Sequence, residues 1–220
     1  MTRSSTARTA IAVGTLSVLA LTGATLAGPA AATHESNLKR AVLHPLNDSG
    51  VHGHAAVRYG ATHINAMVNV TGAAAGLPHA QHIHFGAQAK HECPTARLDT
   101  DRNFRLNTAE GEPAYGPIVV SFTTTGNTSD ASGLAVDRMP VAAANGSFNY
   151  YRTGIRLVAA KTESAAAIRN GIAAGQGVVV VHGIDYNGNG QYDMAAAGAS
   201  ELNPAVPAEA TDPAACGLLR

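Results

Sequence analysis

Short apolar runs rich in β-branched residues, separated by polar turns, make up most of the chain after residue 40. The clearest run alternates Ile64, Ala66, Val68 and Val70, and this period of two is typical of a strand with one buried face. Gly, Asn, Asp and Pro residues between the runs are typical of turns. The other runs that we predict as strands are 41–43, 51–59, 80–85, 117–124, 134–139, 148–158 and 177–182.

One segment has helical rather than strand character. Residues 162–174 have an alanine-rich interior behind Thr162, which is a suitable N-cap. Seven or eight short strands with polar turns predict an all-β fold, a Greek-key β-barrel or sandwich of about eight strands with one short helix and long loops. No internal repeat or linker divides the chain, so we expect residues 33–220 to form a single domain.

The N-terminal 32 residues have the layout of a secretory signal peptide. Arg3 and Arg8 precede an apolar run over 9–26, and the small residues ending at Ala32 fit a cleavage site. A membrane anchor is the alternative, but the strongly apolar core over 11–21 is short for a membrane span. We therefore expect cleavage near Ala32 and a secreted, extracellular protein without a membrane span.

Charge and cysteine content narrow the function further. Removal of Arg3 and Arg8 lowers the basic count from 15 to 13 against 15 acidic residues, which argues against nucleic acid as a partner. Cys93 and Cys216 are the only two cysteines, and in an exported chain such a pair favours a disulfide. In the chain-entropy view the bond contributes about 4–5 kcal/mol. A redox-active or metal-bound pair is the alternative, although no C-x-x-C occurs. Nothing in the sequence indicates the oligomeric state.

The histidines carry the most specific chemical signal. His82 and His84 lie two apart in a predicted strand, so both project from one face and can share a metal ion. His182 ends the apolar strand over 177–182 and is a third candidate ligand. Neutral imidazoles suit copper and zinc. The alternative is a set of solvated or hydrogen-bonded histidines.

These motifs resemble a known family. The segment His82-Ile83-His84-Phe85-Gly86 with Cys93 resembles the H-x-H, F-G and C segment of copper/zinc superoxide dismutases. The run 179–182 and the ending 215–217 resemble that family's V-V-H strand and Ala-Cys-Gly ending, and weaker likenesses lie in 41–53 and 72–76. The histidine features also resemble CHRD domains, an extracellular family of similar β character. The likeness covers most of residues 41–100 and 176–219.

The resemblance implies copper ligands at His82, His84 and His182, and it also implies the Cys93–Cys216 disulfide. Three departures accompany it. Asp99 stands where the family has its metal-bridging histidine, the zinc-site histidines have no counterpart, and residues 212–215 lack the arginine that guides superoxide. We therefore expect no zinc half, and copper held by three histidines.

Two acidic loops have spacings close to that of a twelve-residue calcium loop. In the first loop, 99–110, Phe104 occupies the turn position that usually holds glycine. The second loop, 185–193, keeps Gly190 there but has Ala196 at the closing position. Ordinary polar turns are the alternative for both. The predicted calcium ligands are Asp99, Asp101, Asn103 and Glu110 in the first loop and Asp185, Asn187, Asn189 and Asp193 in the second.

The remaining histidines and Glu209 have weaker signals. His52 and His54 form a second H-x-H. A surface or structural role is favoured for these two and for the scattered His44, His63, His79 and His91. His79 or His91 is also a candidate for a fourth copper ligand. Glu209 is expected to cap or pair locally.

Three functional hypotheses follow: a copper-dependent superoxide dismutase, a non-enzymatic CHRD-like binding module stabilised by a disulfide and calcium loops, and a purely structural domain. The missing arginine and bridging histidine favour the second over the first, and the histidine trio favours either over the third. Whether the protein is an enzyme stays open. We expect a secreted metal-binding protein with a superoxide dismutase-like fold, with copper as the expected metal and metal ions as the partners.

Overall fold

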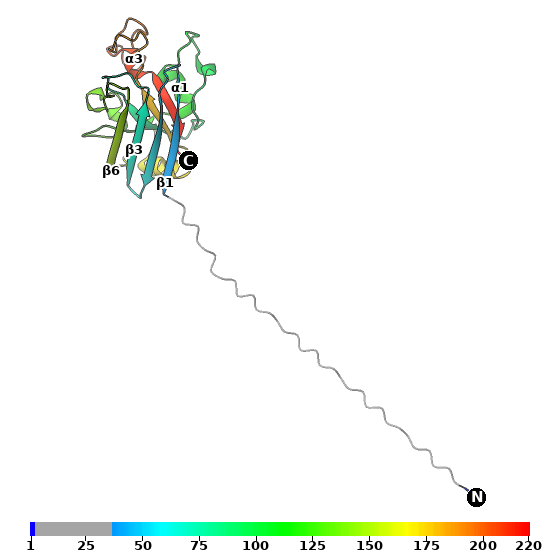
Figure 1. Ribbon diagram of the computed structural model, residues 1–220. Coiled ribbons are helices and arrows are strands. Elements are labelled where there is room, and N and C mark those ends of the chain that lie inside the picture. The colour runs from blue at the N-terminus through cyan, green and yellow to red at the C-terminus, as the bar shows by residue number, and fades with distance from the viewer. Residues whose placement is uncertain (3–36) are drawn as a thin grey trace. The chain divides into compact units, whose positions relative to one another are not determined.

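Eight antiparallel strands form one curled sheet in the computed structural model, which describes residues 1–2 and 37–220 (Figure 1). Their order across the sheet is β5-β4-β7-β8-β1-β2-β3-β6, so β8 returns to lie beside β1 in a Greek-key arrangement. The predicted all-β fold of about eight strands is confirmed. The strands are β1 (Leu38–Pro45), β2 (His52–Tyr59), β3 (His63–Thr71), β4 (Gln81–His84), β5 (Ile118–Ser121), β6 (Phe148–Arg156), β7 (Val178–His182) and β8 (Pro213–Leu218).

The apolar side chains of the strands fill the inside of the curl. In β3 the predicted inward residues are all at most 2% exposed, because the period of two places them on one face. The two edges of the sheet approach each other through side chains. Phe122, just after β5, stacks on Tyr150 of β6 with ring centroids 5.3 Å apart, and Arg152 Nη1 donates to the Thr123 carbonyl at 2.7 Å. These contacts enclose the core.

Three α-helices and three short 3₁₀ turns lie in the connections of the described residues. The α-helices are α1 (Thr108–Tyr115), α2 (Ala165–Ala173) and α3 (Ala208–Thr211), and the 3₁₀ turns are Ala96–Leu98, Asp130–Ser132 and Val136–Arg138. The predicted helix exists, but its N-cap is Ser164, whose side chain accepts from the Ala167 N–H at 3.1 Å, and not Thr162.

The predicted strand over 134–139 is wrong. This segment contains a 3₁₀ turn because Arg138 fixes its end, with Nη1 donating to the carbonyls of Thr125 and Asn127 at 2.9 and 3.1 Å. Strand β8 and helices α1 and α3 were not predicted. Strand β8 has the sequence Pro-Ala-Ala-Cys-Gly-Leu, which contains no β-branched residue to mark it as a strand.

The predicted disulfide between Cys93 and Cys216 is confirmed, with the two Cα atoms 5.7 Å apart. It attaches the long loop after β4 to β8, near the middle of the sheet. Residues 37–220 form one compact unit. The predicted signal peptide lies almost entirely outside the described residues.

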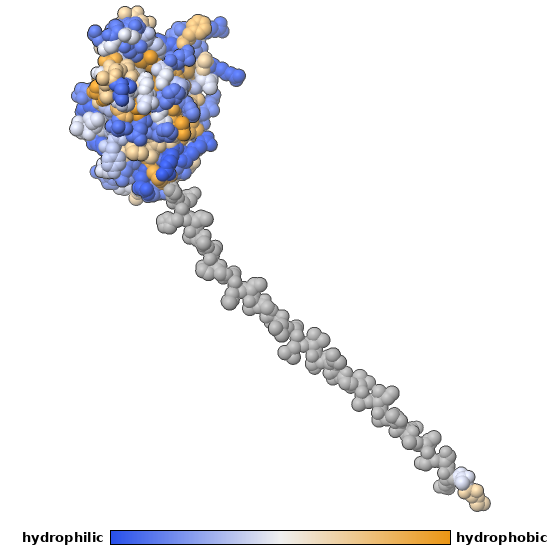
Figure 2. Space-filling view, viewed as in Figure 1, coloured by the Kyte–Doolittle hydropathy of each residue, from blue (hydrophilic) through white to orange (hydrophobic). Residues whose placement is uncertain are grey.

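Hydrophilic residues, blue in Figure 2, are spread over the viewed face between smaller apolar groups. None of the helices in the described part of the chain is long and apolar enough to cross a membrane.

Candidate metal centre

Three histidines that are far apart in the sequence meet on the outer face of the sheet. His82 and His84 lie on β4 and His182 ends the neighbouring strand β7, where His82 is opposite Val180. The centroid of the His82 ring lies 5.0 Å from that of His182 and 5.6 Å from that of His84. One donor nitrogen of each ring lies within 4.8 Å of the other two, and each side chain is at most 2% exposed. The structure thus brings together the three residues that the sequence singled out.

Each of these rings has one nitrogen against a backbone carbonyl and the other without a hydrogen-bond partner. A carbonyl only accepts, so the nitrogen that faces it must carry the hydrogen. The bonded pairs are His82 Nε2 to Gly133 O at 3.0 Å, His84 Nδ1 to Gly116 O at 2.8 Å and His182 Nδ1 to Thr211 O at 2.6 Å. The lone pairs therefore lie on His82 Nδ1, His84 Nε2 and His182 Nε2, which are buried and unpartnered among the described residues.

Burial keeps all three imidazoles neutral. It lowers the pKa of His84 from 6.5 to about 3 and that of His182 from 6.5 to about 4. The pKa of His82 is also held well below 6.5, first by burial and then by repulsion from the other two rings if they were charged. The neutral imidazole is the form that ligates a metal ion. At neutral pH the free nitrogens of the three rings therefore carry no proton and are available to bind a metal cation.

The C-terminal end of α1 positions His84. Gly116, which supplies the carbonyl, has φ +89°, and a Cβ there would lie 2.8 Å from the Gly86 nitrogen, so only glycine fits. The preceding Tyr115 packs its ring on His84 with centroids 4.4 Å apart, and its hydroxyl donates to the Thr108 carbonyl at 2.8 Å. Together these contacts restrict the orientation of the His84 ring.

Loop residues close the histidine group from solvent. A cavity of about 10 Å³ beside His82 and His182 is lined by Gly133, Leu134 and Leu202 among others. This volume is at the lower limit for one water molecule. Leu134 and Leu202 are 38% and 41% exposed, so they form the layer between the cavity and solvent. We call Gly133, Leu134 and Leu202 the cover.

Other candidate ligands do not join the three histidines. Asp99 accepts the N–H groups of its own loop, from Asn103 at 3.1 Å and Phe104 at 2.8 Å. The ring nitrogens of His79 face the carbonyls of Ala74 and His182 at 3.1 and 3.0 Å, and the ring of His91 stacks on Phe85. Within residues 37–220 the group that could hold a metal ion here therefore has three histidine members.

The first acidic loop gathers three carboxylates. Asp99, Asp101 and Glu110 each have an oxygen within 4.8 Å of the others, so they could hold a metal ion. Glu110 Oε1 also accepts from the Thr100 N–H at 2.7 Å, which uses part of its capacity inside the loop. Phe104 has φ +64° and is almost fully exposed, so a bulky residue adopts the left-handed conformation that glycine usually supplies at this turn.

The second acidic loop also turns its polar side chains inward. Asp185 accepts the N–H groups of Asn189 at 3.2 Å and Gly190 at 2.8 Å, and Asp193 accepts from the Asn189 side chain at 2.6 Å. Asn187 Oδ1 accepts the Asn189 N–H at 3.1 Å. All four predicted residues of this loop therefore surround one tight turn, with Gly190 at φ +79°.

Two buried carboxylates, Glu209 and Asp212, fasten these loops to α3 and to the residue that follows it, and the sequence pointed only to a local capping or pairing role for Glu209. Glu209 is fully buried and accepts the N–H groups of Tyr186 at 3.0 Å and Asp193 at 2.8 Å. Asp212 accepts from the Tyr186 hydroxyl at 2.9 Å and from Arg105 of the first loop at 2.5 Å. Burial raises the pKa of Asp212 to about 6, although Arg105 opposes the shift. Both loops therefore converge on α3, whose last residue holds His182.

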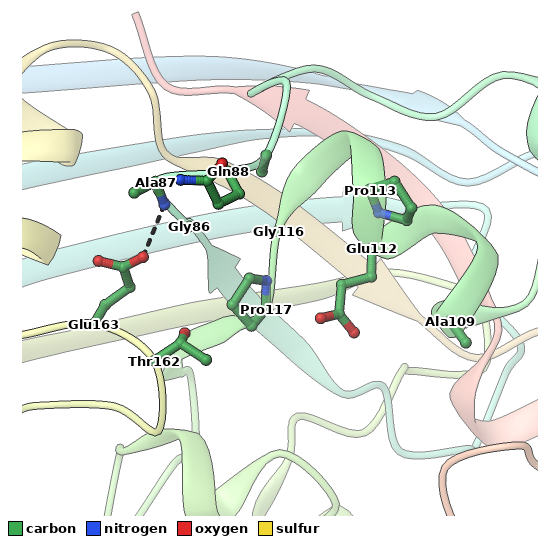
Figure 3. A pocket seen from close by; sticks show the side chains of 11 residues that line it. Gly86, Ala87, Gln88, Ala109, Glu112, Pro113, Gly116, Pro117, Thr162 and Glu163 are labelled. Carbon is green, nitrogen blue, oxygen red and sulfur yellow. Dashed lines mark hydrogen bonds between the residues drawn. The ribbon is translucent and has the colours of Figure 1, made fainter.

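An open pocket of about 380 Å³ is lined by Gly116 and Pro117 among others (Figure 3). Glu112 and Glu163 flank Pro117 there, and Glu163 accepts the Ala87 N–H at 2.8 Å. None of the predicted metal ligands lines this pocket. The closed histidine group, and not this pocket, is therefore the candidate site.

Comparison with protein-family models finds no matching family, and comparison with curated proteins finds no match. The fold and the site define the class of the protein directly. It is a disulfide-bonded antiparallel β protein with a buried three-histidine group that could hold a metal ion.

Proposed function

We propose that this protein is an exported copper-binding protein whose ligands are His82 Nδ1, His84 Nε2 and His182 Nε2. The observation that carries the proposal is that these three buried nitrogens have lone pairs, lie within 4.8 Å of one another and have no hydrogen-bond partner. Leaving a buried acceptor unsatisfied costs about 1–3 kcal/mol. A bound ion removes that cost at three atoms at once.

Copper fits the ligand set better than zinc. Nitrogen ligands bind Cu(II) more tightly than Zn(II) in the usual order of stability. Structural zinc sites have four protein ligands, and catalytic zinc sites have three with an open position for water. Here the histidine group has three members and lies under the cover. The likeness of the H-x-H and V-V-H segments to the copper half of superoxide dismutases supports the same metal.

Retention of copper suits the site better than rapid turnover. The cover separates the histidines from solvent, whereas a dismutase must admit superoxide to its copper. The family's guiding arginine is absent from residues 212–215, and Asp212 is instead buried in an ion pair with Arg105. We therefore favour a non-enzymatic, CHRD-like binding module over a superoxide dismutase.

Calcium is the proposed ion for the acidic loops. Both present the hard oxygen ligands that calcium prefers, arranged around tight turns. Through Glu209 and Asp212 the loops brace α3, so calcium would stabilise the domain in the way that the CHRD-like interpretation requires.

The deciding experiment is metal analysis of the exported, mature chain after exposure to copper, zinc and calcium and subsequent desalting. We expect the mature chain to begin near Thr33 and to retain one copper without zinc. His84→Ala should lose that copper, whereas His63→Ala, which changes an exposed histidine elsewhere, should keep it. Retention of calcium alone, or of no metal, would contradict the copper assignment.

Superoxide assays then separate the two functions that copper allows. We expect the copper-loaded chain to dismutate superoxide no faster than an equal amount of free copper. A rate well above that of free copper, lost in His84→Ala, would instead establish the enzyme.

A further inference from the structure

Three further histidines lie on the outer face of the sheet, exposed to solvent. His44 is in β1, and His52 and His54 are in β2. They alternate with the buried residues Leu43 and Ala55, so their side chains point away from the core. His52 and His54 therefore project from the same face of one strand.

The strand register brings His44 to the same place. Val42 is opposite His54 and Leu43 is opposite Gly53, which is the last pair between β1 and β2. His44 and His52 each lie one residue beyond that pair, so they are the next residues to face each other across the two strands. Directly opposite residues have Cβ atoms about 4.5–5.5 Å apart, and residues two apart on a strand are about 6.6 Å apart. The Cβ atoms of the three histidines thus lie at the corners of one small triangle.

The three rings are free to bind. No hydrogen bond or ion pair within the described part of the chain involves the side chains of His44, His52 or His54. The next strand places Thr71 opposite His52 and Asn69 opposite His54, so the neighbours on that side are uncharged and carry oxygen donors. Their ring nitrogens are not already gathered within 4.8 Å, as those of the buried group are. Exposed side chains change rotamer within nanoseconds, so ring rotation can complete the set.

We propose that His44, His52 and His54 form a second, solvent-exposed site for a divalent transition-metal ion, with Cu(II) bound more tightly than Zn(II). Imidazole nitrogen is a good ligand for both ions, and the stability order favours Cu(II). Water completes the coordination because the site is open. Such a site exchanges its ion with solution faster than the covered group does.

The two sites are separate but share one face of the sheet. His44 is opposite Cys216, Cys216 is opposite Val180, and Val180 is opposite His82. Three strand spacings of about 4.8 Å place the two groups roughly 14 Å apart. The disulfide lies between them at Cys216. One ion cannot bridge that distance, so the sites bind independently.

The test is a Cu(II) titration of the mature chain followed by a chelator chase, with bound copper measured over time. Wild type should bind two ions, one released fast and one slowly. The double variant His52→Ala/His54→Ala should lose the fast ion and keep the slow one, with at least tenfold weaker binding at the exposed site. His63→Ala is the matched control, because His63 is an exposed histidine at the other end of the hairpin between β2 and β3, and it should behave as wild type.

The same titration of His84→Ala keeps this proposal distinct from the buried copper site. That variant should lose only the slow ion. If the fast ion persists unchanged in His52→Ala/His54→Ala, or if no fast ion is seen in wild type, the exposed site is refuted whatever the buried group does. Absence of the slow ion alone would refute the proposed function and leave the exposed site standing.

Discussion

Lowering the pH from 8 to 5 should destabilise the metal-free protein through His84 and His182. Their pKa values fall from 6.5 in the unfolded chain to about 3 and about 4 in the folded one. As the pH falls through 6.5, the unfolded chain gains protons that the folded chain does not, so the free energy of unfolding decreases. The stabilising contribution is complete above pH 6.5 and is lost progressively down to the folded pKa.

The magnitude follows from the distance between pH 5 and 6.5. Each pH unit corresponds to about 1.4 kcal/mol. At pH 5 each of the two histidines therefore lowers the free energy of unfolding by about 2 kcal/mol, or about 4 kcal/mol together. His82 acts in the same direction. Asp212 acts in the opposite direction, because its pKa of about 6 lies above the ordinary 3.8 and the folded protein gains its proton first. That offset is about 1.4 kcal/mol at pH 5, so a net loss remains.

Urea unfolding of the metal-free chain at pH 8, 7, 6 and 5 measures this slope. His84→Leu removes one of the titrating groups, so the loss between pH 8 and 5 should shrink by about 2 kcal/mol. His63→Ala, at an exposed site, should leave the slope of wild type unchanged. Equal slopes in wild type and His84→Leu would refute the reasoning, because the buried imidazoles would then not be the groups that titrate.

Three further predictions concern the supports of the site. Replacing Cys93 and Cys216 by serine should lower the free energy of unfolding by about 4–5 kcal/mol in urea, since the bond closes a long loop, and an unchanged midpoint would contradict this. Leu134→Ala makes the cover smaller and should increase the rate of copper release to a chelator about tenfold, which corresponds to a barrier lower by roughly 1.4 kcal/mol. The amount of bound copper should not change. Equal release rates in the variant and in wild type would show that the cover does not limit exchange. Glu209→Gln replaces one buried acceptor that receives the N–H groups of loop 185–193, and it should lower the free energy of unfolding by about 1–3 kcal/mol, measured by thermal unfolding. An unchanged free energy of unfolding would contradict the bracing role.

The strands could be predicted where the sequence alternates. Residues 64–70 have a strict period of two, and the strand exists because one face is buried. The segment 134–139 was also predicted as a strand, but its first residue belongs to the cover and its end is fixed by Arg138, and no local sequence pattern shows this. Strand β8 consists of small residues between β7 and β1, where close packing selects them against β-branched side chains. A Cβ on Gly217 there would lie 2.3 Å from the Val42 carbonyl oxygen.

The three candidate ligands could be predicted, but not what orients them. H-x-H and a histidine after a valine run are visible in the sequence. The partners of their second nitrogens are the backbone carbonyls of Gly116, Gly133 and Thr211, and a carbonyl leaves no residue-specific mark. The burial of Glu209 and Asp212 was equally invisible, because it depends on two loops that meet only in the folded chain.

If the acidic loops hold calcium and the histidines hold copper as proposed, the hydrogen bond between His182 and the Thr211 carbonyl should couple the binding of the two ions. Helix α3, which ends at Thr211, is held by Glu209, and Glu209 in turn accepts N–H groups from the second acidic loop. Calcium that orders this loop should therefore restrict α3, slow the release of copper and raise the affinity for copper. Copper should then raise the affinity for calcium by the same factor as calcium raises the affinity for copper. Chelator chases with and without calcium measure the effect, and Asp185→Asn should abolish it while leaving copper binding intact. If calcium changes neither copper release nor copper affinity in wild type, α3 does not transmit between the two sites.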